Sequence, residues 1–65
     1  MSYRDARELV RIRYELRSLA AQGAKHVAAP LLERMTSLAS RDAAESAAVQ
    51  KEVQRWQCVF RLETP

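Results

Sequence analysis

Cysteine, histidine, glycine and proline are scarce in this 65-residue chain, which has one Cys, one His, one Gly and two Pro. A lone cysteine has no partner for an intramolecular disulfide, and one Cys with one His supplies too few ligands for a structural zinc. The shortage of Gly and Pro removes most of the turn residues on which β-sheet folds depend. The remaining composition favours helices, so we expect an all-α fold.

Long apolar runs are missing as well. No stretch approaches the roughly 20 apolar residues of a membrane span. The first residues, MSYRDARELV, are charged from Arg4 onward and lack the apolar segment of a secretory signal. An unpaired cysteine also fits a reducing compartment. We therefore expect a cytoplasmic protein with no membrane partner.

The length predicts one small helical domain over residues 1–65. A chain of this size buries only about 60% of the surface that its unfolded form exposes. Apolar burial and the loss of conformational entropy then nearly cancel. Since disulfides and zinc are excluded, self-association is the common remedy that remains. We expect a homodimer or a subunit of a complex.

The first half of the chain predicts a helix over about residues 3–22. Ser2 is a suitable N-cap, and Asp5 lies where the helix dipole favours a negative charge. Gly23 suits the left-handed residue after a helix, and it opens a connection over 23–29. The main apolar stripe consists of Leu9, Ile12, Leu16 and Leu19. A second apolar wing consists of Tyr3, Ala6, Val10 and Tyr14. Together they predict a wide buried face.

The second half predicts a helix over about residues 30–62, with Pro30 in its first turn. Its apolar residues form two clusters, Leu31, Met35 and Leu38, followed by Val49, Val53, Trp56 and Phe60. Leu31 and Val49 are about five whole turns apart at roughly 3.6 residues per turn, so one continuous helix keeps both clusters on one face. The predicted architecture is an antiparallel helical hairpin, in which the first helix is short and the second is long.

A break near residues 40–42 is the alternative. Ser40 or Asp42 can cap a third helix, and Glu45 stands three residues after Asp42, as in a capping box. The apolar stripe also falters here, because Asp42, Glu45 and Ser46 occupy positions where apolar residues are due. This alternative predicts a three-helix bundle.

The C-terminal end of the predicted long helix is the candidate partner surface. The first helix would cover its partner only to about residue 50, so the apolar residues beyond that point would overhang. Exposed apolar patches of this kind mark association sites, and aromatic residues and Arg are enriched at interface hot spots. The candidate partner-binding residues are Val53, Trp56, Val59, Phe60 and Leu62. If the chain breaks near residue 42, Trp56 and Phe60 are expected to fill the core instead.

Catalysis is not expected. His26 falls in the connection, and no general base is placed beside Cys58, which fits a small apolar helix residue. An anion clamp of the kind used by small helical mutases would draw on Arg11, Arg34 and Arg55, but no motif supports it. We expect no catalytic residue, no metal, no cofactor and no small-molecule substrate.

Nucleic acid is the alternative partner. Arg4, Arg7 and Arg11 share a face opposite the leucine stripe, as phosphate contacts would. Glu8 and Glu15 follow Arg4 and Arg11 at a spacing of four, which is also typical of a solvated helix face with internal ion pairs. The formal charge of +3 permits an acidic partner without requiring one.

The sequence therefore predicts a small non-enzymatic protein-protein interaction module, acting as an adaptor, co-chaperone or regulator. In size and predicted layout the chain resembles the short helical co-chaperones of bacterial secretion systems and the small helical regulators encoded by phages. The resemblance is one of architecture and implies a role in binding another protein.

Overall fold

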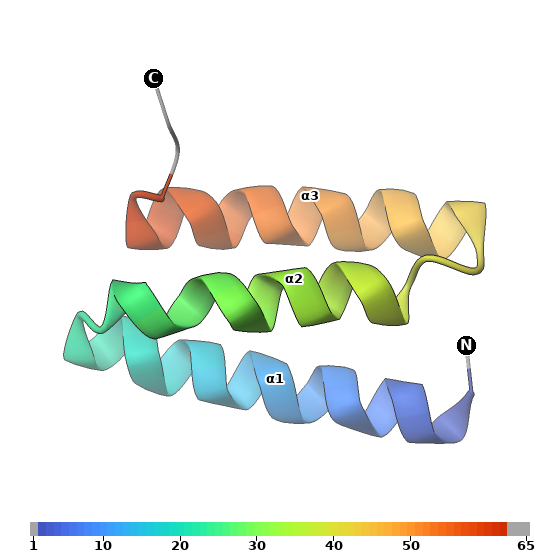
Figure 1. The fold of residues 1–65 in the computed structure, drawn as a ribbon, viewed down its shortest axis with the longest axis horizontal. Coiled ribbons are helices and arrows are strands. Elements are labelled where there is room, and N and C mark those ends of the chain that lie inside the picture. Colours follow the sequence, from blue (N-terminus) through green and yellow to red (C-terminus); the bar gives the residue numbers. More distant parts are fainter. Residues whose placement is uncertain (1, 63–65) are drawn as a thin grey trace.

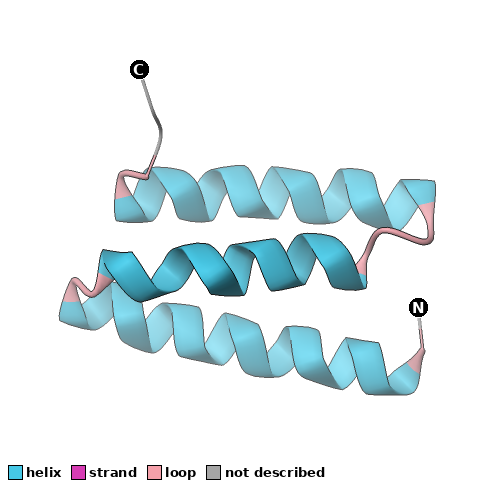
Figure 2. Cartoon of the chain, viewed as in Figure 1, coloured by secondary structure: helices cyan, strands magenta, loops and turns pink. Residues whose placement is uncertain are grey.

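The computed structural model describes residues 2–62, and it contains no strand within that range. Its elements are α1 (Tyr3–Gln22), a 3₁₀ turn (Lys25–Val27), α2 (Ala28–Leu38) and α3 (Ala43–Phe60). Successive helices run in opposite directions, and α2 lies between α1 and α3 in the view of Figure 1 and Figure 2. The all-α fold class expected from the composition is confirmed.

Both ends of α1 lie where the sequence predicts them. The hydroxyl of Ser2 accepts a hydrogen bond of 3.1 Å from the backbone N–H of Asp5. Gly23 has a positive φ of 70°. Its N–H donates to the carbonyl of Ala20, and the next N–H, that of Ala24, donates to the carbonyl of Leu19. This pair of bonds is a Schellman motif, which turns the chain towards α2.

The prediction of one continuous helix over residues 30–62 is wrong. The second helix ends at Leu38 and a new helix begins at Ala43. In Figure 2 the loop between them reverses the chain, so α3 runs back beside α2. The break lies where the alternative prediction placed it, near residues 40–42. The connection before α2 is also shorter than predicted, because α2 already begins at Ala28.

Local hydrogen bonds stabilise both sides of the break. Asp42 has extended backbone angles, with φ −125° and ψ 124°, and its side chain accepts a 3.0 Å hydrogen bond from the N–H of Glu45. The hydroxyl of Ser40 donates to the carbonyl of Ser37 at 2.8 Å and so satisfies an acceptor at the end of α2. Capping groups on both sides of the loop compete with helix continuation.

All three helices contribute to one core. Leu16 of α1 and Met35 of α2 are completely buried. The other buried apolar residues are Leu9, Ile12, Ala28, Leu32, Leu38, Ala39, Val49 and Phe60. The leucine and isoleucine stripe predicted for α1 therefore faces the core as expected, with Leu19 partly buried against it.

Two ion pairs tie α1 to the other helices. Arg13 donates from Nε and Nη2 to both carboxylate oxygens of Glu52 on α3, with two bonds of 2.8 Å. Arg34 on α2 donates from the same two nitrogens to both oxygens of Glu8. Each pair has the two-pronged geometry that makes Arg a specific carboxylate partner. The orientation of α1 is thus fixed by polar contacts as well as by the core.

Candidate functional site

The predicted C-terminal partner surface is largely covered by the chain itself. Phe60 is buried, with 5% of its surface exposed, and only Val59 is strongly exposed, at 57%. The other three predicted residues, Val53, Trp56 and Leu62, are partly buried and pack against the core. Because α3 folds back on α2, the described residues leave no apolar overhang at this end.

Trp56 is held by contacts within the chain. Its ring centroid lies 6.0 Å from that of Phe60, with the two planes tilted by 33°. Its indole N–H donates to the carboxylate of Glu52 at 3.3 Å. The same carboxylate also accepts a hydrogen bond from Arg13 of α1. Trp56 therefore belongs to a packed and hydrogen-bonded junction of α1 and α3.

The second apolar wing of α1 lies on the opposite side from the core. The sequence predicted that this wing is part of a wide buried face, and the structure shows that this prediction is wrong. Tyr3 is 78% exposed, Val10 56% and Tyr14 74%. Their spacings of seven and four place them on one line along the helix, turned away from the Leu9, Ile12 and Leu16 stripe. We call Tyr3, Val10 and Tyr14 the outer stripe of α1.

Arginines border the outer stripe. Arg4, Arg7 and Arg11 are all exposed. The guanidinium of Arg7 lies over the ring of Tyr3, 5.8 Å from its centroid. This is within the range of a cation–π contact, which orients both side chains. The outer stripe thus combines aromatic, aliphatic and cationic groups.

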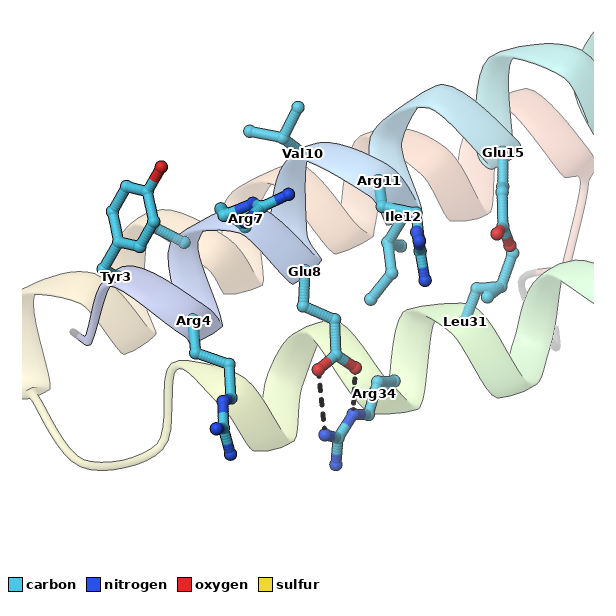
Figure 3. A pocket seen from close by; sticks show the side chains of 11 residues that line it. Tyr3, Arg4, Arg7, Glu8, Val10, Arg11, Ile12, Glu15, Leu31 and Arg34 are labelled. Carbon is cyan, nitrogen blue, oxygen red and sulfur yellow. Dashed lines mark hydrogen bonds and ion pairs between the residues drawn. The ribbon is translucent and has the colours of Figure 1, made fainter.

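A groove of about 970 Å³ runs between the outer stripe and α2 (Figure 3). Its lining includes Arg4, Arg7 and Arg11 of α1, together with Arg34 of α2. Apolar surface comes from the outer stripe residues Tyr3 and Val10, and from Ile12 and Leu31 between the helices. The structure therefore brings the three arginines of the nucleic-acid alternative into one groove.

Carboxylates also line this groove. Glu8 does not pair with Arg4 as its spacing suggested, but with Arg34 across the groove (Figure 3). The hydrogen bonds from Arg34 lower the pKa of Glu8 below its ordinary value, and the nearby charge of Arg11 acts in the same direction. Glu15 lines the groove at its far end. Along this edge of α1 the side chains of Arg4, Glu8, Arg11 and Glu15 alternate in charge.

The ion pair of Arg13 and Glu52 lies outside the groove and has a structural role. The hydrogen bonds from Arg13 lower the pKa of Glu52, and the indole N–H of Trp56 adds to this effect, while partial burial opposes it. The pKa of Arg13 is raised in turn by its hydrogen bonds to Glu52. Both partners thus remain charged at neutral pH.

Candidate catalytic groups are dispersed. His26 is exposed in the 3₁₀ turn, and Cys58 is exposed on α3. Arg11 and Arg34 both line the groove, but Arg55 does not. The three candidates for an anion clamp therefore do not converge. Among residues 2–62, no cluster of three or more His, Cys, Asp or Glu side chains has a metal-binding arrangement. In the same range, none of the helices has the length and apolar character needed to cross a membrane.

Comparison with known proteins identifies no related protein. No family model, no curated protein and no solved structure gives a significant match to this chain. The functional interpretation therefore rests on the residues and their geometry.

The sequence contained a signal for the outer stripe. On a helical wheel with about 100° per residue, Tyr3, Val10 and Tyr14 lie within roughly 40° of one another. The same wheel puts each of them at least about 100° away from Leu9, Ile12 and Leu16. The sequence thus indicates two separate apolar faces on α1, and among the described residues the face with Tyr3, Val10 and Tyr14 remains exposed.

Proposed function

We propose that this protein is a small non-enzymatic protein-protein interaction module, and that the outer stripe of α1 is its docking surface. One observation supports this most strongly. Three large apolar side chains lie exposed on one face of a well-capped helix, at 78%, 56% and 74% of their full surface. Single exposed apolar residues are ordinary, but an aligned group is typical of an association site.

The composition of this face supports the proposal. Tyr and Arg are among the residues that contribute most to binding at protein interfaces. Tyr3 and Tyr14 offer large, stiff surfaces with a polar tip, and Arg7 is already oriented over Tyr3. Because Leu9, Ile12 and Leu16 fix the other face of α1 in the core, docking requires little ordering of the helix.

The homodimer hypothesis keeps its argument from the small size of the chain, but it loses the surface proposed for it. That surface was an apolar overhang near Trp56 and Phe60, and in the described residues that end of α3 packs on its own chain. We therefore place the partner on α1 and propose that the chain works as a subunit of a complex.

Photo-crosslinking tests this proposal. A benzophenone side chain replaces Tyr14 on the outer stripe or, as a matched control, Gln54 on the exposed side of α3. We expect the variant at position 14 to crosslink one discrete protein in cells of the source organism, and the variant at position 54 to crosslink none. A nuclease-sensitive product from position 14 would instead assign the surface to nucleic acid. Equal yields of the same product from both positions would contradict the docking surface.

A further inference from the structure

The arginines beside the outer stripe indicate what kind of protein docks there. We infer that the occupant is an acidic polypeptide segment that also carries apolar or aromatic side chains, an inference that rests on the proposed function of α1. Its carboxylates would lie against Arg4, Arg7 and Arg11. Its apolar side chains would pack on Tyr3, Val10 and Tyr14.

Most of the net positive charge of the chain belongs to α1. Helix α1 carries five arginines against three acidic residues, whereas residues 41–63 carry four basic and four acidic residues. Within the described part of the chain, no ion pair engages Arg4, Arg7 or Arg11. Glu8 pairs with Arg34, and Glu52 pairs with Arg13, so neither of these carboxylates neutralises the three arginines by a direct ion pair. The outer stripe is thus bordered by three exposed arginines that can bind carboxylates of another molecule.

A second copy of this chain does not fit the surface. If two outer stripes packed on each other, the same arginines of both copies would line one interface. Like charges placed together across an interface cost several kcal/mol and suppress that pairing. The arginines beside the outer stripe therefore favour a negatively charged partner over a second copy of this chain.

A nucleic-acid backbone fits less well than a polypeptide. A nucleic-acid strand carries a negative charge at every nucleotide, one per about 3.4 Å in a duplex strand. Beside Arg4 and Arg11 it would also meet Glu8 and Glu15, which alternate with them along the groove. An acidic polypeptide can place its carboxylates at the arginines and neutral residues elsewhere. It also supplies the side chains that the outer stripe is able to bury.

Binding of defined polymers tests the inference. The probes are fluorescent poly-glutamate, a random copolymer of glutamate and tyrosine, and an oligothymidylate, each measured by anisotropy. We expect the copolymer to bind most tightly, and its affinity to fall as NaCl rises from about 0.05 M to about 0.5 M, because exposed charges are then screened. Double replacement of Tyr3 and Tyr14 by Ala should remove the preference for the copolymer over poly-glutamate.

Matched charge variants locate the binding. One variant combines Arg4→Gln, Arg7→Gln and Arg11→Gln, and the control combines Arg41→Gln, Lys51→Gln and Arg55→Gln. Both remove three exposed positive charges, so net charge is equal. We expect the first variant to bind the copolymer about tenfold more weakly, as for three exposed charge contacts, and the control to change affinity less than about twofold. Far-UV circular dichroism checks that both variants remain helical, as expected.

The outcomes separate the two proposals. Equal losses in both variants would overturn the inference, since net charge alone would then explain binding. Failure of the copolymer to bind would also overturn it, while a discrete protein crosslinked from position 14 would still support the docking surface. If oligothymidylate binds more tightly than the copolymer and depends on the same arginines, both proposals fail in favour of nucleic acid.

Discussion

The outer stripe of α1 and the C-terminal turns of α3 both contain two aromatic residues at helical spacing, but their surroundings are opposite. Tyr3 and Tyr14 are mostly exposed, at 78% and 74%. Phe60 is buried, and Trp56 is partly buried against the core. The difference arises from the fold of the chain, because α3 is folded back on α2 while no described residue covers the outer side of α1.

This contrast shows why aromatic content alone does not locate an interface. Trp56 and Phe60 are both large and apolar, but Phe60 is part of the core and Trp56 packs against it. Tyrosine tolerates water through its hydroxyl, so it can remain exposed in a monomer and still bury a large surface on binding. The predictions below test this division between core and docking surface.

Removing Phe60 should have the largest effect on stability. Phe60→Ala empties a buried site, and such changes cost about 3–5 kcal/mol. A domain of this size has about that much stability in total. We therefore expect loss of the folded state, measured by far-UV circular dichroism and urea titration. The matched control is Val59→Ala on the exposed neighbouring position, which should change stability by less than about 0.5 kcal/mol. Similar effects of the two substitutions would contradict the assignment of Phe60 to the core.

Removing the N-cap of α3 should have the next largest effect on stability. Asp42→Ala deletes the acceptor for the N–H of Glu45 and should cost about 1 kcal/mol. Asp42→Ser keeps a capping oxygen, so it should retain most of the stability in the same urea titration. If Asp42→Ala were more stable and more helical than the natural chain, a continuous helix would be the better description.

The ion pair that joins α1 to α3 should make stability depend on pH. The pKa of Glu52 is lowered from its ordinary value of 4.5, so its pairing stabilises the fold above that pH. This contribution is lost as pH falls through the lower pKa of the folded state. Because both groups are partly exposed and screened, Glu52→Gln should cost about 1 kcal/mol at neutral pH. The difference from the natural chain should shrink in acid, as measured by urea titration across pH.

A control for that experiment is Glu33→Gln, which removes an exposed carboxylate of α2. Its stability should follow that of the natural chain across the same pH range. If Glu33→Gln and Glu52→Gln changed the free energy of unfolding equally at every pH, the pH dependence would reflect net charge and not the contact with Arg13.

The smallest effect on stability is expected on the outer stripe. Tyr14→Ala removes an exposed side chain and should change the free energy of unfolding by less than about 0.5 kcal/mol. The same substitution should weaken binding of the glutamate and tyrosine copolymer, measured by anisotropy. A substitution that leaves the fold intact but reduces binding would distinguish Tyr14 from Phe60. A loss of stability comparable to that of Phe60→Ala would place Tyr14 in the core instead.

The sequence predicts α1 well because its signals are local. Ser2 and Gly23 define its ends, and their capping bonds require only neighbouring residues. The break before Asp42 is harder to predict, since a helix through this region keeps the apolar stripe in register. The choice depends on what α3 gains by packing beside α2, which is a long-range effect. The exposure of Tyr3 and Tyr14 follows from the same packing, because α2 and α3 cover only the face of α1 that carries Leu9, Ile12 and Leu16.

The central claim is that the docking surface lies on α1 and not on the end of α3. The most direct measurement compares crosslinking from position 14 with crosslinking from position 59, both of which are exposed in the folded chain. We predict that a photoreactive side chain at position 14 captures a discrete protein partner, and that the same group at position 59 does not. Capture from position 59 with none from position 14 would contradict this account and return the interface to the C-terminal turns.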